Sequence, residues 1–161
     1  MKPAKHNIRL IGRREFVNLP QLGMYGVEAK IDTGAYTSSL HCESISVSET
    51  EAKPMLYLSV KQTEKGAETL QVLKFAEFSR KKIKNSFGEM EERFVIKTMI
   101  HIGKKKILSN LSLSNRDNMR YPLLIGRKLL KGKFVVDVNQ VHTGGVNLTK
   151  AFNQLNKTKD L

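Results

Sequence analysis

Alternating apolar and polar residues run through most of the chain and predict β-strands. Within residues 93–103, one face carries Phe94, Ile96, Thr98, Ile100 and Ile102. Shorter stripes lie at 107–114, where Leu108 breaks the alternation, and at 56–60, 70–78 and 134–138. Turn-forming residues separate these stripes at 64–66, 85–88 and 115–118. The pattern predicts an all-β fold.

Helices are expected at only two places. The sequence predicts a short helix at 127–131, ended by Gly132. A second short helix at 149–155 or a frayed end is expected after Gly144-Gly145. No repeat or linker divides the chain, so we expect a single domain over residues 1–161, with a polar C-terminal tail from about residue 143.

The first chemical motif follows a strand predicted at 27–31. That strand would turn Val27, Ala29 and Ile31 inward, so Asp32 falls on the opposite face as the strand ends. Thr33 and Gly34 then allow a sharp turn, because glycine tolerates backbone angles closed to other residues. A carboxylate held on such a turn suits aspartic proteolysis, in which two carboxylates share one proton. An ordinary turn is the alternative. Since the chain has one Asp-Thr-Gly, the dyad would require two chains.

The second motif is Leu123-Leu124-Ile125-Gly126-Arg127, an apolar strand, a glycine and the start of a helix. Its simplest interpretation is a buried strand that enters a helix. An aspartic protease needs the same arrangement behind the catalytic turn. The two motifs, in this order, resemble the active-site turn of the retropepsins, the dimeric aspartic proteases of retroviruses.

A closer resemblance covers about residues 11–137. It is carried by these blocks: Ile11-Gly12-Arg13-Arg14-Glu15-Phe16-Val17, Leu19-Pro20, Leu22-Gly23, Ala29-Lys30-Ile31-Asp32-Thr33-Gly34-Ala35, Thr37-Ser38, Leu40-His41, Arg93-Phe94-Val95-Ile96, Asn115-Arg116-Asp117-Asn118-Met119-Arg120 and Ile125-Gly126-Arg127. Together they resemble a bacterial family of retropepsin-like aspartic peptidases, also named as ATP-dependent zinc proteases. The resemblance implies a closed acid-protease β-barrel. It also implies association with glutamate ligases that add glutamates to a ribosomal protein or to other acceptors.

The two motifs, the candidate flap and the possible partners of Arg127 give three groups of expected site residues. Asp32, Thr33 and Gly34 would be catalytic, and Ala35, Tyr36, Thr37 and Gly88 would contact substrate. Ile125, Gly126, Arg127 and Asp117 would support the turn.

The chain also departs from the viral pattern. Tyr36 stands where the viral enzymes carry an aspartate that pairs with the arginine of the second motif. Arg127 therefore needs another partner, and Asp117 or a backbone carbonyl are the options. A flap that excludes water is expected at 84–92 with Gly88 at its tip, and an ordinary exposed hairpin is the alternative.

Charge narrows the class of partner. The 28 Lys and Arg residues exceed the 15 Asp and Glu residues, which gives a net charge of +13 and favours acidic partners. Nucleic acid is not favoured, because the chain has no Trp and its Tyr residues do not interleave with the basic runs. Cys42 is the single cysteine, so an internal disulfide is excluded and a cytoplasmic location is expected. The first ten residues lack the apolar core of a signal peptide, and no stretch is long enough to span a membrane.

The sequence shows no pattern typical of a metal site or of a nucleotide-binding site. The potential metal ligands are widely scattered along the sequence: they are His6, His41, Cys42, His101 and His142. The sequence contains no His-Glu-x-x-His motif. His41 and Cys42 are adjacent, and adjacent strand residues point to opposite faces. No glycine-rich phosphate loop is present. We therefore expect neither a metal site nor a cofactor.

Three functions follow. The first is a homodimeric aspartic peptidase that cuts an acidic peptide or protein, such as a glutamate-modified tail. The second is a non-catalytic module of the same fold that binds an acidic protein or a ribonucleoprotein. The third is a basic barrel that binds RNA. Asp32 discriminates the first from the other two, because binding alone requires no carboxylate in that turn.

Overall fold

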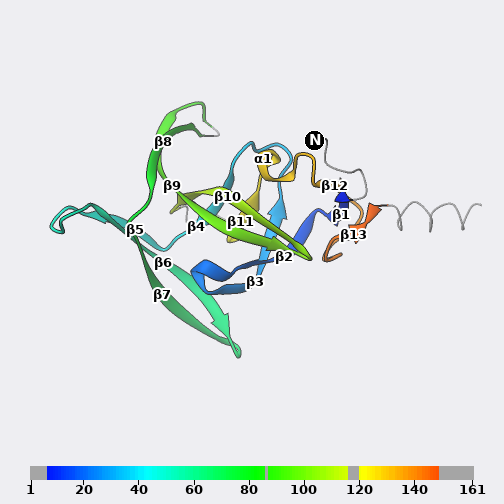
Figure 1. The fold of residues 1–161 in the computed structure, drawn as a ribbon, viewed down its shortest axis with the longest axis horizontal. Helices are drawn as coiled ribbons and strands as arrows, with labels where there is room; N and C mark the ends of the chain where they lie inside the picture. The colour runs from blue at the N-terminus through cyan, green and yellow to red at the C-terminus, as the bar shows by residue number, and fades with distance from the viewer. Residues whose placement is uncertain (1–6, 86, 116–119, 149–161) are drawn as a thin grey trace, which may run out of the picture.

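The computed structural model describes residues 7–85, 87–115 and 120–148, and it is dominated by β-strands (Figure 1). The strands are β1 (Arg9–Gly12), β2 (Arg14–Leu19), β3 (Met24–Ile31), β4 (Ser38–His41), β5 (Ser44–Ser48), β6 (Met55–Glu64), β7 (Ala67–Phe75), β8 (Ser79–Lys84), β9 (Met90–Ile102), β10 (Lys105–Ser114), β11 (Leu123–Ile125), β12 (Phe134–Asp137) and β13 (Val146–Asn147). Two short helical pieces interrupt them, η2 (Pro20–Leu22) and α1 (Arg127–Leu130). The short helix predicted at 127–131 is thus confirmed as α1.

A closed six-stranded barrel forms the centre of the molecule. Its strands follow the order β10-β4-β11-β3-β2-β9, and β9 pairs back with β10 to close the ring. The predicted all-β, retropepsin-like barrel is therefore confirmed. Closure leaves these six strands without a free edge in the ring, which avoids the exposed backbone groups of an open sheet.

The barrel core follows from the alternation along β9. Ile96, Thr98, Ile100 and Ile102 are buried, whereas Lys97 points to solvent. In the neighbouring β10, Leu108 is 57% exposed, which matches its position outside the alternation. The two strands pair antiparallel over 95–102 and 105–112, so their inward residues close one side of the core.

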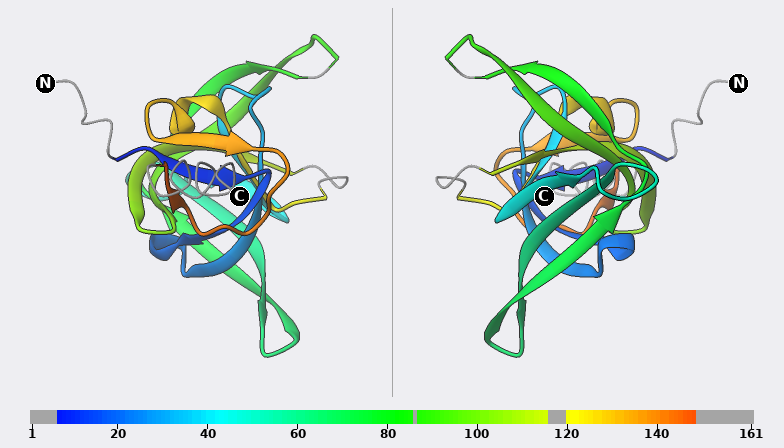
Figure 2. Two further views of the ribbon diagram at one scale, coloured as in Figure 1. Left: turned by 90° about the vertical axis from the view of Figure 1, so that its right-hand side faces the viewer. Right: turned by 90° about the vertical axis from the view of Figure 1, so that its left-hand side faces the viewer.

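Two hairpins extend beyond the barrel in opposite directions (Figures 1 and 2). β6 and β7 pair over their whole length and join β5 in a separate three-stranded sheet. β8 pairs with the first half of β9 and forms the second hairpin. The strand predicted at 70–78 is wrong at its end, since β7 stops at Phe75. The ring of Phe78 instead packs edge-on against Phe94, with centroids 5.9 Å apart.

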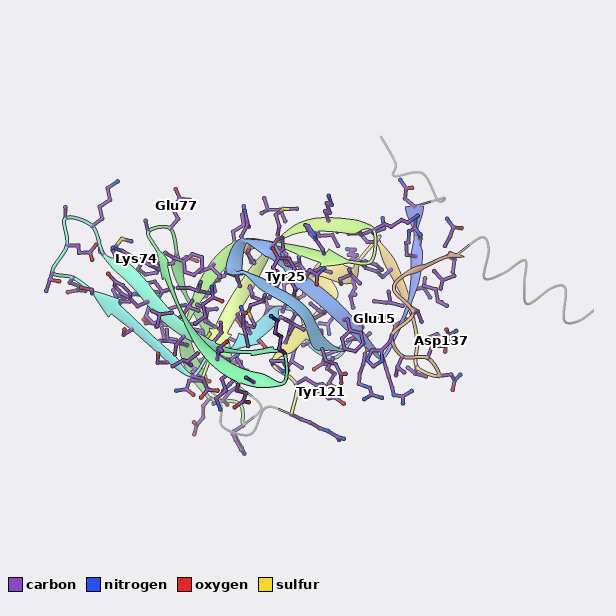
Figure 3. The ribbon with its side chains drawn as sticks, turned by 90° about the horizontal axis from the view of Figure 1, so that it is seen from below. Glu15, Tyr25, Lys74, Glu77, Tyr121 and Asp137 are labelled. Carbon is purple, nitrogen blue, oxygen red and sulfur yellow. The ribbon has the colours of Figure 1, made fainter. Side chains whose placement is uncertain are left out.

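A third small sheet, in the order β12-β1-β13, joins the two ends of the described chain. The buried carboxylate of Glu15 holds the segment before β13 against β1 and β2 (labelled in Figure 3). It accepts hydrogen bonds from the amides of Gly12, Thr143 and Gly144 and from the hydroxyl of Thr143. The helix considered at 149–155 lies outside the described residues. Within the described part of the chain, no helix is long and apolar enough to cross a bilayer.

Candidate active site

The two sequence motifs meet where β3 and β11 run parallel. Ile31 stands opposite Ile125 in this pairing. The amide of Asp32 donates to the carbonyl of Ile125 at 2.8 Å, so the ladder continues one residue past the end of β3. The expected adjacency of the Asp-Thr-Gly turn and the Ile-Gly-Arg segment is therefore confirmed.

Backbone groups hold the Asp32 side chain at the start of the turn. The amide of Gly34 donates to Asp32 Oδ1 at 3.1 Å, and the amide of Ala35 donates to the Asp32 carbonyl at 3.2 Å. Asp32 is half-buried, while Thr33 and Gly34 are exposed. The backbone therefore holds the Asp32 carboxylate in place, and one side of the carboxylate stays accessible to another molecule.

Gly126 lets the second motif approach the turn closely. A Cβ atom there would lie 2.7 Å from the Tyr36 carbonyl oxygen and 2.8 Å from two carbonyl atoms of Thr37. The Gly126 amide donates to Ser38 Oγ at 3.0 Å. The next amide, that of Arg127, donates to the Ala35 carbonyl at 2.8 Å. A larger residue at position 126 would push these elements apart.

Arg127 braces the turn through a backbone carbonyl, one of its two expected partners. Its guanidinium donates to the Thr33 carbonyl at 2.8 Å and lies 6.0 Å from the centroid of the Tyr36 ring. This bond replaces the carboxylate partner of the viral pattern. Asp117, the other expected partner, lies outside the described residues. Tyr36 is 60% exposed and forms the outer surface of the turn.

Two hollows flank the turn. A groove of about 650 Å³ lies on the side of α1, and its lining includes Thr33, Tyr36, Arg127, Leu130 and Phe134. A basic cavity of about 290 Å³ lies against the end of β3, and it is lined by Arg13, Arg14, Lys30, Ile31, Arg120 and Tyr121. We call the second one the basic cavity. Sequence reasoning did not predict it, although Lys30 carries a signal: it stands two residues before Asp32, on the same face of the strand.

The tip of hairpin β8–β9 carries Gly88, the expected flap residue. Gly88 has a φ of 81° and donates to the Asn85 carbonyl at 3.0 Å. Asn85 Oδ1 accepts the amides of Phe87 and Glu89, so one side chain organises the turn. The hairpin leaves the barrel at the end that also carries the turn between β3 and β4 (Figures 1 and 2).

The residues near His41 and Cys42 do not fit a zinc site. His41 Nε2 lies 3.2 Å from Glu43 Oε1, and Cys42 is fully buried. Burial raises the pKa of the Cys42 thiol from 9.0 to about 12, because the thiolate would lose its solvation. A neutral buried thiol is a poor zinc ligand, since the metal takes the thiolate. In the described part of the chain, no three His, Cys, Asp or Glu side chains gather around a common point where a metal could bind.

Comparison with known proteins agrees with this geometry. Curated relatives include proteins named "Probable alpha-L-glutamate ligase" from Shewanella halifaxensis and from Desulfotalea psychrophila, each 32% identical. The matches cover 81% and 80% of this chain but only 29% and 28% of the relatives. The chain thus spans less than a third of the length of these relatives.

A solved structure shares the fold. The crystal structure of the Legionella pneumophila protein Lpg0085, of unknown function, superposes with a TM-score of 0.66 at 27% identity. The superposition covers 84% of this chain and 98% of that one. The family model described as "Retropepsin-like aspartic endopeptidase RimB" matches residues 10–144, which include both motifs and the Asp32 turn. The chain therefore belongs to the RimB-like family of retropepsin-like proteins.

Proposed function

We propose that this chain is an aspartic endopeptidase that works as a homodimer and cuts acidic peptides. The single observation that carries the proposal is the braced turn at 32–37. The amide of Gly34 and the guanidinium of Arg127 hold the turn that carries Asp32, while the Asp32 side chain stays half-exposed. Acid–base catalysis requires a carboxylate in a fixed position, and a rigid turn provides it.

The mechanism requires Asp32 from each of two chains. Two carboxylates this close share one proton, because both cannot ionise together. The ionised carboxylate accepts a proton from a water molecule, whose oxygen attacks the scissile carbonyl. The protonated carboxyl donates a hydrogen bond to the carbonyl oxygen. Collapse of the tetrahedral intermediate breaks the C–N bond, and the leaving amine takes up the proton that the carboxylate accepted from water.

The groove beside α1 supports association through this face. It adjoins the turn at Thr33 and Tyr36, and its apolar lining comes from Leu130, Phe134 and Val136. An apolar surface next to an incomplete dyad is a natural place for a second copy, because burial of that surface favours association. A two-fold axis near Tyr36 would bring the two Asp32 side chains together.

The proposed substrate is acidic. The net charge of +13 attracts such a chain, and the curated relatives are named as glutamate ligases. A functional link to a glutamate ligase, with a glutamate-modified peptide or protein as substrate in the cytoplasm, belongs to the same proposal. Hairpin β8–β9 would serve as the flap. Its tip offers the exposed apolar side chains of Phe87 and Met90, which are 89% and 64% exposed.

Replacement of the proposed base tests the mechanism. The variant Asp32→Asn should lose cleavage of an acidic peptide by at least about a thousandfold, because the amide cannot accept the proton from water. Its circular dichroism spectrum and melting temperature should match those of the wild type. Glu68→Gln on hairpin β6–β7 removes an exposed carboxylate elsewhere and should leave the barrel and cleavage intact.

Mixed dimers separate the two-chain dyad from a single-chain site. Wild-type protein mixed with an excess of Asp32→Asn should lose activity as heterodimers form, and specific activity should rise with total wild-type concentration. Full activity of Asp32→Asn, or of a strictly monomeric preparation, would exclude the dyad. An inactive protein that still binds acidic peptides would then favour the non-catalytic module.

A further inference from the structure

The basic cavity concentrates positive charge beside the catalytic turn. Lys30 comes from β3, Arg13 precedes β2 and Arg14 begins it, and Arg120 precedes β11, with Tyr121 completing the wall (labelled in Figure 3). The pairing of Arg14 with Lys30 across β2 and β3 explains how two of these cations become neighbours. Arg120 reaches the same cavity from the segment before β11. Basic side chains from three separate parts of the sequence thus line one cavity.

Among the described residues, only part of this charge is neutralised. Arg14 lies 3.6 Å from Glu28, and Glu28 also contacts His142 at 3.2 Å. Arg13 donates to the carbonyl of Val138, which carries no net charge. For Lys30 and Arg120, no carboxylate of the described residues lies within ion-pair distance.

Uncompensated cations in one cavity repel one another, so the arrangement favours a bound anion. Some basic residues elsewhere are instead neutralised by a carboxylate: Lys74 lies 3.2 Å from Glu51, and Lys61 lies 3.7 Å from Glu43. The basic cavity is therefore a place where positive charge remains available for a ligand.

The position of Lys30 relates the cavity to the scissile bond. In a strand, residues i and i+2 point to the same side and stand about 7 Å apart. Lys30 and Asp32 have this spacing, and the ladder hydrogen bond from the Asp32 amide keeps the backbone extended between them. A substrate bound in extended form advances by a similar distance for every two residues. The cavity therefore lies within reach of a side chain one or two positions from the cut bond.

We propose that the basic cavity is the specificity subsite of this enzyme, and that it takes the side-chain carboxylate of an acidic residue close to the scissile bond. Lys30 and Arg120 supply the charges that no carboxylate of the described residues pairs with, and Arg13 and Arg14 line the same wall. This assignment rests on the proposed peptidase function, and it goes further by naming the residues that select acidic substrates. A volume of about 290 Å³ holds one or two carboxylate side chains rather than a folded domain.

Binding to an inactive background tests the subsite without catalysis. The probe is a fluorescent decapeptide with four consecutive glutamates, and its matched counterpart has glutamines in their place. Both are titrated with the Asp32→Asn protein, and fluorescence anisotropy gives the Kd. Adding Lys30→Gln and Arg120→Gln should weaken binding of the glutamate peptide about tenfold or more, since two charged contacts are lost. Binding of the glutamine peptide should change less than about twofold.

Two further variants control for charge and for folding. Lys53→Gln with Lys104→Gln removes the same net charge at exposed positions outside the cavity and should leave the affinity within about twofold. Lys30→Arg retains the positive charge and should retain the preference for glutamate. Lys30→Glu with Arg120→Glu should reverse it, so that a peptide with four arginines binds better than the glutamate peptide. Thermal melts confirm that each variant is folded.

The outcomes separate this inference from the proposed function. Equal loss of affinity in the Lys53/Lys104 pair, or displacement of the peptide by a short RNA at equimolar concentration, would overturn the subsite. Cleavage of both peptides at equal kcat/KM by the wild type would overturn it as well, while leaving the aspartic peptidase in place. Selective, Lys30-dependent binding without any Asp32-dependent cleavage would support the subsite and remove the peptidase.

Discussion

Glu15 offers a sharp stability test, because one buried carboxylate joins the two ends of the described chain. Its side chain is 1% exposed. Oε1 accepts the Gly12 amide at 2.9 Å, the Thr143 amide at 3.0 Å and the Thr143 hydroxyl at 2.5 Å, and Oε2 accepts the Gly144 amide at 3.2 Å. Glu15→Ala would remove all four acceptor contacts at once.

The expected loss of stability depends on whether each donor finds another hydrogen-bond partner once the carboxylate is removed. A buried donor left without a partner costs about 1–3 kcal/mol, and Gly12 is buried while Gly144 is exposed. The Thr143 hydroxyl lies 3.3 Å from the Leu10 carbonyl and retains that acceptor. Loss of the carboxylate also relieves the cost of burying a charge. The balance is a loss of about 3–5 kcal/mol in the free energy of unfolding, a large fraction of the about 5–15 kcal/mol of a typical domain.

Urea unfolding followed by circular dichroism measures this loss. Glu15→Gln should lose about half as much, because its amide provides one acceptor oxygen for the cluster of donors. Glu77→Ala removes an exposed carboxylate (labelled in Figure 3) and should change stability by no more than about 0.5 kcal/mol. A loss below about 1 kcal/mol in Glu15→Ala would refute the reasoning, since the four contacts would then contribute nothing net.

Two further changes probe the turn and the core. Gly126→Ala should cost about 1–3 kcal/mol and speed hydrogen exchange at the amides of 32–37, because its Cβ would meet backbone atoms of that turn. Gly132→Ala meets nothing within 4 Å but is strained by its φ of 75°, so it controls for a loss of stability away from the turn and should leave local exchange at 32–37 unchanged. Equal local exchange in the two variants would contradict the argument. Iodoacetamide at pH 8 should label Cys42 only after unfolding. The raised pKa of this thiol gives stability that is present below pH 9 and lost as pH rises towards about 12, and Cys42→Ala should flatten that loss in urea titrations.

Local patterns predicted the strands well because their cause is local. Side chains alternate with a period of two wherever one face is buried, so β9 and the stripe in β6 are visible in the sequence alone. The alternation places the end of β7 at Phe78, three residues too late. Phe78 is partly buried because its ring packs against Phe94, although it lies outside the strand. Hydrophobicity reports burial, and it does not distinguish strand from a packed bend.

The supports of the site depend on long-range contacts that no local pattern records. Glu15 and Thr143 are 128 positions apart, and Arg127 reaches the Thr33 carbonyl from 94 positions away. The resemblance of motifs placed Asp32 beside Gly126, but no local pattern indicates that the segment before β11 brings Arg120 to the same cavity as Lys30. A flap role for Gly88 and a supporting role for Asp117 stay predictions.

Total charge and local charge make separable contributions to substrate selection. The net charge of +13 acts over the Debye length of about 8 Å at physiological salt, so its effect on the rate of encounter fades as salt is added. Contacts inside the basic cavity act at hydrogen-bond distance and are screened less. Added salt should therefore lower the rate at which the glutamate peptide associates with the wild type and with the Lys53/Lys104 variant alike. Both proteins should keep a residual preference for the glutamate peptide over the glutamine peptide. Only the Lys30/Arg120 variant should lose that residual preference, because it alone removes cations that line the basic cavity.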